Sequence, residues 1–231
     1  MSAIHRNIQL IKAKIQYLEK KFQRPRDSVK LLAVSKTRPV ECILEAVEGG
    51  ITAFGENYVQ EGIQKILLCQ EIKTKIPLEW HFIGPVQSNK TRLVAEYFDW
   101  VHTIDRPRIA QRLNEQCPQC KSPLQVLIQV NTSGETSKSG VAMSELFNLL
   151  DLLSSLPNLR LRGLMSIPAR VIHYKSQLEA FKTLSDLNAE IAKHNSGVDT
   201  LSMGTTEDME ASIEAGSSIV RIGTGIFGAR N

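Results

Sequence analysis

The chain has 231 residues, 42% of them hydrophobic and 23% charged, a composition typical of a globular protein. The net charge is +4, but basic residues are scattered among acidic ones, which disfavours a nucleic-acid-binding face. No apolar run approaches the roughly 20 residues that cross a bilayer, and the N-terminus lacks a secretory signal. We therefore expect a cytoplasmic protein, a monomer, with neither nucleic acid nor membrane as a partner.

The four cysteines do not indicate a metal site. Cys117 and Cys120 have CxxC spacing, but zinc needs two more ligands, and no second cysteine pair or histidine pair lies nearby. We expect free thiols and no bound metal.

The first segment is a predicted amphipathic helix. Ile8, Ile11, Ile15, Leu18 and Phe22 recur at steps of three and four among polar residues, and the pattern ends near Arg24-Pro25. We expect this helix to lie against the outside of the domain or to close one end of it.

After this helix, short apolar runs alternate with helical patterns. The predicted strands are 31–35, 51–54, 78–83, 100–104, 124–130, 159–165, 198–203 and 218–222. Between them we expect helices at 39–48, 59–71, 89–96, 105–116, 144–153, 174–193 and 207–215. About eight strand–helix units predict an α/β fold, a single (β/α)8 TIM barrel over residues 1–231 with an extra N-terminal helix. An open doubly wound sheet is the alternative, but the first turn lacks the glycines typical of that fold.

In such barrels the functional site lies at the carboxyl ends of the strands. The residues that follow the predicted strands therefore outline the candidate site: Lys36, Asn57, Gly84, Thr103, Asp105, Asn131, Lys138, Met165, Ser166, Ser202, Gly204, Arg221, Gly223 and Thr224.

Lys36 is the most informative of these residues. It comes at the end of the predicted strand 31–35, just after the apolar run Leu31–Val34. A lysine at such a position either forms an ion pair with an acid such as Glu56 or takes part in chemistry. Burial disfavours the ammonium form, and a neutral amine attacks aldehydes. Lys36 is therefore a candidate Schiff-base lysine.

The last two strands predict an anion site. Phosphate sites in these barrels are commonly built from the loops after strands seven and eight. Here those loops carry the glycines and hydroxyls of 202–205 and 223–225, although ordinary turn chemistry explains them equally well. Arg221 alternates with apolar neighbours and should point inward, towards a salt-bridge partner or a ligand acceptor. A phosphorylated aldehyde such as pyridoxal 5′-phosphate would satisfy both the lysine and the phosphate loops.

Seven segments in order resemble the pyridoxal-phosphate-binding homeostasis family, whose barrel is like the N-terminal domain of alanine racemase. They are LLAVSKT (31–37), FGENYVQE (54–61), WHFIGPVQSNK (80–90), SKSG (137–140), LRGLMSIP (161–168), LSMGTTEDME (201–210) and VRIGTGIFGAR (220–230). The resemblance implies pyridoxal 5′-phosphate as cofactor, Lys36 as its Schiff-base lysine, Asn57 beside the ring and Arg221 facing the pyridine nitrogen. It also implies Ser166, Ser202, Gly204, Gly223 and Thr224 around the phosphate, and no catalytic residues.

The resemblance further implies a role in vitamin B6 and amino-acid homeostasis without established catalysis, with pyridoxal-phosphate-dependent apoenzymes as candidate recipients. The sequence ends soon after the last predicted strand, so we expect no second domain that would supply another acid or base.

The alternatives are a weak racemase or lyase using the same cofactor, a Schiff-base aldolase acting on a sugar phosphate, and an interaction protein. Lys138 is a candidate for phosphate contact or cofactor hand-off, against the default of a solvent-facing loop lysine.

Overall fold

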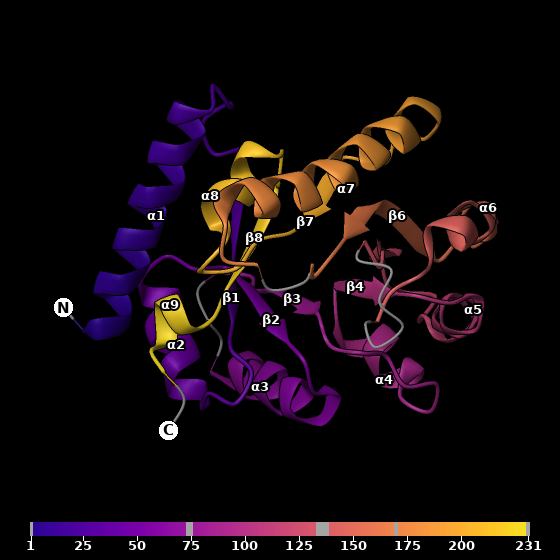
Figure 1. Cartoon of the computed structure of the whole chain (residues 1–231). Helices are drawn as coiled ribbons and strands as arrows, with labels where there is room; N and C mark the ends of the chain where they lie inside the picture. The colour runs from indigo at the N-terminus through magenta and orange to yellow at the C-terminus, as the bar shows by residue number, and fades with distance from the viewer. Residues whose placement is uncertain (1, 73–75, 133–138, 169–170, 230–231) are drawn as a thin grey trace.

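The computed structural model describes residues 2–72, 76–132, 139–168 and 171–229. Its centre is a closed barrel of parallel strands in the order β1 to β8 (Figure 1). The strands are β1 (Lys30–Val34), β2 (Ala53–Glu56), β3 (Glu79–Phe82), β4 (Trp100–Ile104), β5 (Leu124–Gln129), β6 (Leu159–Met165), β7 (Thr200–Ser202) and β8 (Ile219–Ile222). The predicted (β/α)8 barrel is confirmed.

Helices follow the strands along the chain and pack around the barrel (Figure 1). They are α1 (Ala3–Lys21), α2 (Val40–Glu48), α3 (Val59–Glu71), α4 (Thr91–Tyr97), α5 (Pro107–Gln116), α6 (Leu146–Ser154), α7 (Tyr174–His194), α8 (Met209–Glu214) and α9 (Thr224–Phe227), with a short 3₁₀ turn at Met143–Glu145. The large apolar cluster lies mainly between these helices and the outer face of the sheet, which is where a barrel of this class buries its amphipathic helices.

The strand register determines which side chains face the barrel interior together. Parallel pairing aligns Leu32 with Arg221, His81 with Trp100, and Met165 with Ser202. Because paired residues point to the same side of a sheet, polar groups from several strands meet inside the barrel.

The N-terminal helix α1 lies outside the barrel, the first of the two expected arrangements. It contacts α2, α8 and α9 and buries Ile8 and Leu18 completely or nearly so. Asn7 Nδ2 donates to the carbonyl of Ile226 at 2.9 Å, which ties the first helix to the last.

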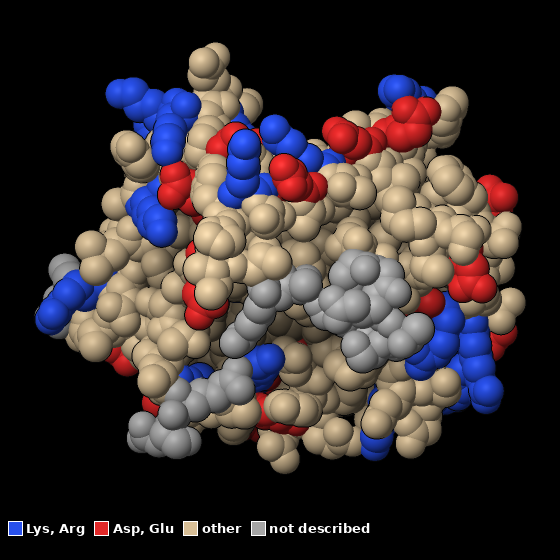
Figure 2. Space-filling view, viewed as in Figure 1, with Lys and Arg blue, Asp and Glu red and all other residues tan. Residues whose placement is uncertain are grey.

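Two details differ from the sequence expectation. Strand β7 spans only Thr200–Ser202, shorter than the predicted 198–203, and the residues Thr224–Phe227, for which no helix was predicted, form helix α9. Charged side chains of both signs are interspersed over the face shown in Figure 2. In the described part of the chain, no helix combines the length and apolar character needed to span a bilayer.

Candidate functional site

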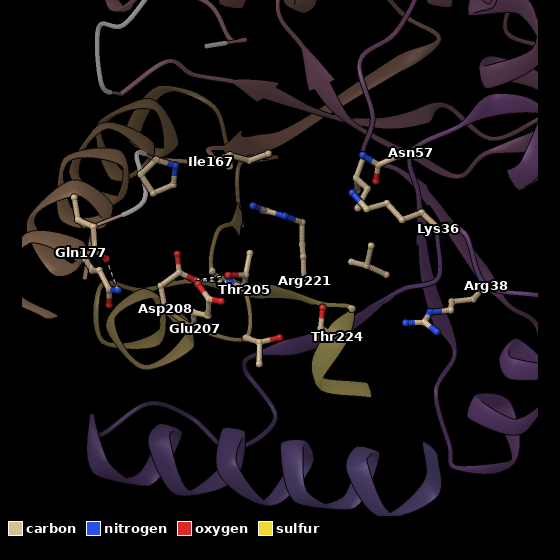
Figure 3. A pocket seen from close by; sticks show the side chains of 17 residues that line it. Lys36, Arg38, Asn57, Ile167, Gln177, Thr205, Glu207, Asp208, Arg221 and Thr224 are labelled. Carbon is tan, nitrogen blue, oxygen red and sulfur yellow. Dashed lines mark hydrogen bonds between the residues drawn. The ribbon is translucent and has the colours of Figure 1, made fainter. Parts of the chain in front are cut away.

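A cavity of about 500 Å³ opens at the carboxyl ends of the strands. Its walls come from the ends of β1, β2, β3, β6, β7 and β8 and from Gln177 on α7. Lys36 and Asn57 enter from one side, the loop of Thr205, Glu207 and Asp208 lies across the cavity, and Arg221 extends between them (Figure 3). The architecture thus brings residues far apart in sequence to one site.

The backbone on both sides of Lys36 is held by a buried ion-pair cluster. Lys65 Nζ donates to the Ser35 carbonyl at 2.7 Å and to the carboxylates of Glu56 at 2.8 Å and Glu61 at 2.5 Å. Glu61 accepts from the backbone N–H of Thr37, which has a left-handed φ of 63°. Lys65 therefore holds the residue before Lys36 directly and the residue after it through Glu61.

Glu56 is fully buried and is engaged by Lys65 and by the Ser35 hydroxyl at 2.6 Å. Burial raises the pKa of its carboxyl despite the opposing effects of Lys65 and Ser35. Glu56 had been a possible ion-pair partner for Lys36, but the structure assigns it an ion pair with Lys65. Lys36 itself is half-buried in the cavity wall rather than fully buried.

Asn57 is positioned by a close backbone approach. A Cβ on Gly84 would lie 2.1 Å from the Asn57 carbonyl oxygen, so only glycine fits there. The Thr103 hydroxyl donates to the Gly84 carbonyl at 2.6 Å and fixes that loop in turn. Gly84 and Thr103, both at predicted strand ends, thus support Asn57 from behind.

Arg221 provides a buried positive charge at the floor of the cavity. Nη1 donates to Ser202 Oγ at 2.7 Å and Nη2 to the Ser166 carbonyl at 2.9 Å. Among the described residues, no carboxylate lies within ion-pair distance of it. Burial lowers the pKa of Arg221 to about 10, against the opposing influence of Asp208, so the guanidinium stays charged at neutral pH. Such a group has donors to offer a ligand.

The loop after β7 presents backbone to the opposite part of the cavity. Gly204 has a φ of +95°, and a Cβ on it would lie 2.0 Å from Ser212 Oγ. Thr205 donates from its N–H and hydroxyl to Asp208 at 2.6 and 2.8 Å, which closes a tight turn before α8. Gly223 and Thr224, after β8, line the same region.

The structure places the eight predicted cofactor-binding residues in two layers. Lys36, Asn57, Gly204, Arg221, Gly223 and Thr224 line the cavity. Ser166 and Ser202 are completely buried and lie outside the lining, in contact with Arg221. The Ser202 hydroxyl is hydrogen-bonded to Arg221 and to His102. This role in holding Arg221 could not be predicted from the residue type alone. Lys138 lies outside the described residues.

Three buried polar atoms of the residues described above have no hydrogen-bond partner within the described structure. They are Asn57 Oδ1 on a lining residue, Ser166 Oγ behind the lining, and Glu56 Oε2 in the cluster beside Lys36. Unsatisfied buried polar atoms are costly and rare, so the one on a lining residue, Asn57 Oδ1, indicates a place for a polar ligand.

Sequence reasoning missed part of the site. Arg38 lines the cavity and donates from Nη2 to the carbonyls of Gly228 and Ala229, which holds the C-terminal segment near β1. His81 and His102 were also missed, although the alternation of Glu79 with His81, and of Trp100 with His102, was a readable signal for polar groups on an interior face.

Comparison with known proteins gives consistent matches over the whole chain. The family model for the alanine racemase N-terminal domain matches residues 3–231. A pyridoxal phosphate homeostasis protein from Vibrio alginolyticus is 62% identical, with 100% of this chain and 99% of that protein covered. The protein of the same name from Escherichia coli K12 is 52% identical over 100% of this chain and 98% of that protein.

Solved structures agree with these matches. PipY of Synechococcus elongatus PCC7942, solved with pyridoxal phosphate (PLP) bound, is 31% identical, with a TM-score of 0.80 over 93% of this chain and 100% of that one. Alanine racemase from Corynebacterium glutamicum is 18% identical with a TM-score of 0.71 over 99% of this chain and 60% of that enzyme, a likeness of fold alone.

Proposed function

Because the chain belongs to the family of pyridoxal phosphate homeostasis proteins, whose barrel is that of the alanine racemase N-terminal domain, we propose that it binds PLP in the cavity above Arg221 and serves PLP homeostasis. The observation that carries this proposal is one cavity with an amine, a buried cation and a lining residue, Asn57, whose buried Oδ1 has no partner within the described structure.

The residues present fit this cofactor. Lys36 would hold the aldehyde carbon, and Asn57 Oδ1, unpaired within the described structure, would face a polar ring substituent. Gly204, Gly223 and Thr224 would surround the phosphate, where glycine backbone permits close approach of N–H groups. Ser166 and Ser202 would act from beneath through Arg221.

Bound PLP supplies an electrophilic carbonyl and an electron-withdrawing ring. Arg221 can only donate hydrogen bonds, so it would act as a donor towards the ring nitrogen and would keep that nitrogen unprotonated. This would weaken the electron-withdrawing power of the ring and would favour holding the cofactor over driving chemistry on an amino acid.

We propose accordingly that the protein is a non-catalytic carrier. A racemase needs proton-transferring groups on both faces of the substrate carbon. Among the described lining residues there is no tyrosine, histidine or cysteine. The two lining carboxylates, Glu207 and Asp208, both lie on the loop after β7, and Asp208 accepts hydrogen bonds from Thr205. We further propose a single-domain, monomeric, cytoplasmic protein that passes PLP to dependent apoenzymes.

The test of cofactor binding is spectroscopic. The full-length protein, titrated with PLP and reduced with borohydride, should retain the label on the peptide that contains Lys36, and Lys36→Ala should lose the covalent label. The matched control is Lys12→Ala, a half-buried lysine that bonds the Gly49 and Gly50 carbonyls far from the cavity lining. Label at other lysines in place of Lys36 would overturn the proposed site.

Absence of catalysis has its own test. The PLP-loaded protein, incubated with a panel of amino acids in deuterated water, should show no exchange at the α-carbon above free PLP. Exchange that disappears in Lys36→Ala would replace the carrier proposal with the racemase or lyase alternative.

A further inference from the structure

A continuous network of hydrogen bonds runs inside the barrel away from the cavity floor. Arg221 Nη1 bonds Ser202 Oγ at 2.7 Å, and Ser202 Oγ contacts His102 Nδ1 at 2.9 Å. His102 Nε2 contacts His81 Nδ1 at 2.8 Å, and His81 Nε2 contacts Glu79 Oε1 at 2.5 Å. We call these five residues the interior network.

The two ends of the interior network fix its direction. Arginine can only donate, so the Ser202 oxygen accepts from Arg221, and the Ser202 proton must go to His102 Nδ1. His102 then carries its proton on Nε2 and donates to His81 Nδ1, and His81 carries its proton on Nε2 and donates to the Glu79 carboxylate. The reverse polarity would leave the Ser202 proton without an acceptor and would turn a bare imidazole nitrogen towards Glu79.

Burial and charge agree with this assignment. His81 and His102 are completely buried, and burial lowers the pKa of both imidazoles, which keeps them neutral. Burial alone would raise the pKa of Glu79, but the His81 hydrogen bond and the Lys30 ammonium at 2.7 Å outweigh it and lower that pKa to about 2. The network therefore joins a cation at the cavity to an anion at the amino-terminal end of β3.

We propose that His102 and His81 are positioning residues that transmit the negative charge of Glu79 to Arg221 and so hold the guanidinium against the ring nitrogen of the bound cofactor. This inference rests on the proposed PLP site. Asp208 acts electrostatically on Arg221, but no described carboxylate lies within ion-pair distance of this buried guanidinium. Aligned hydrogen bonds polarise one another, so Glu79 can act on Arg221 through the network as a second, remote counter-ion.

The direction of the hydrogen bonds in the interior network is tested on the cofactor-free, full-length protein. Solution NMR of ¹⁵N-labelled histidine should report His81 and His102 as neutral rings protonated on Nε2, assigned by loss of signals in His81→Asn and His102→Asn. A ring protonated on Nδ1, or doubly protonated at neutral pH, would overturn the network. This result does not depend on whether the protein binds PLP.

The effect on the site is measured by a double-mutant cycle with PLP affinity and the absorption maximum of bound PLP as readouts. Glu79→Gln keeps an acceptor for His81 but removes the charge that polarises the network and holds Arg221, and should weaken PLP binding about five- to tenfold, as for an interaction lost between coupled residues. His102→Asn keeps an acceptor near Ser202 but is too short to reach His81, so it should have the same effect.

The double variant separates transmission from local structure. If the network transmits charge, Glu79→Gln should add nothing once His102→Asn has cut the connection, because coupled residues are non-additive. Lys30→Gln is the matched control, since it breaks the Lys30–Glu79 ion pair and leaves the Glu79 charge in place, with affinity expected within about twofold.

Two outcomes would overturn the positioning role, and a third would overturn the proposed function. Effects that multiply in the double variant, or a Glu79→Gln protein with wild-type affinity and spectrum, overturn the positioning role. A wild-type protein that does not bind PLP overturns the proposed function and leaves the NMR assignment of the network standing.

Discussion

At the scale of single residues, the site depends on a few positions where only one residue type fits. Gly204 and Gly228 both have left-handed φ angles, +95° and +80°, but their surroundings differ. A Cβ on Gly204 would meet Ser212 Oγ at 2.0 Å, whereas a Cβ on Gly228 would meet nothing within 4 Å. The pair therefore separates the cost of backbone strain from the cost of a clash.

We predict that Gly204→Ala lowers the free energy of unfolding by about 3 kcal/mol or more, since strain and overpacking combine. Gly228→Ala should cost about 1–3 kcal/mol, from strain alone, because φ of 80° with ψ of −179° is a conformation that few residues other than glycine adopt. Chemical denaturation of both variants measures the difference. Equal losses would show that the Ser212 contact relaxes without cost.

Single residues also show why part of the site could not be predicted from the sequence. Lys36 and Arg221 were identifiable because a charged residue ends or interrupts an apolar run. Ser202 was expected at the phosphate, but its hydroxyl is committed to Arg221 and His102. Which way a hydroxyl bonds depends on its neighbours in space, and His102 lies 100 positions away in sequence.

At the scale of elements, α3 positions the cavity end of β1. Lys65 on α3 bonds the Ser35 carbonyl and two carboxylates, so the helix fixes the segment that presents Lys36. Its partner Glu56 ends β2 and is completely buried. Helix packing and site geometry are thus coupled through one buried ion pair.

We predict that Lys65→Met lowers the unfolding free energy by about 3–5 kcal/mol, because it leaves the buried Glu56 carboxylate without its counter-ion. The control Lys193→Met breaks the exposed Lys193–Glu190 pair on α7 and should cost less than about 0.5 kcal/mol. Thermal and urea denaturation measure both. A small loss in Lys65→Met would mean that Glu56 is already neutral in the native protein.

At the scale of the whole molecule, the barrel interior carries groups that titrate differently in the folded and unfolded states. The pKa values of His81 and His102 are lowered from 6.5, and that of Glu79 from 4.5 to about 2. Lys30, Asp99 and Arg221 are the charged groups that act on them. Below pH 6.5 the two histidines become protonated in the unfolded chain but stay neutral in the folded protein. The free energy of unfolding therefore falls as the pH falls.

We predict that the unfolding free energy decreases from pH 7.5 towards pH 5, by up to about 1.4 kcal/mol per pH unit for each buried histidine. Glu79 adds a further loss between pH 4.5 and about 2. Glu56, whose pKa is raised, opposes the trend at its own titration, and its contribution cancels when wild type and His102→Asn are compared. Urea denaturation at several pH values measures how steeply the unfolding free energy falls with pH, and this dependence should be weaker in His102→Asn than in wild type. An identical pH dependence in both proteins would contradict the buried, neutral state of His102.

Eight alternations of apolar strand and amphipathic helix allow few arrangements other than a barrel, so the fold could be predicted from the sequence. The same alternation put Lys36, Asn57, Gly204, Arg221, Gly223 and Thr224 at strand ends, and in the structure they line the cavity. The partners of Arg221 and the backbone supports of Lys36 could not be predicted in this way. Periodicity reports which face a side chain takes within its own strand, whereas hydrogen bonds between strands depend on register and barrel closure, which bring distant residues within 3 Å of one another.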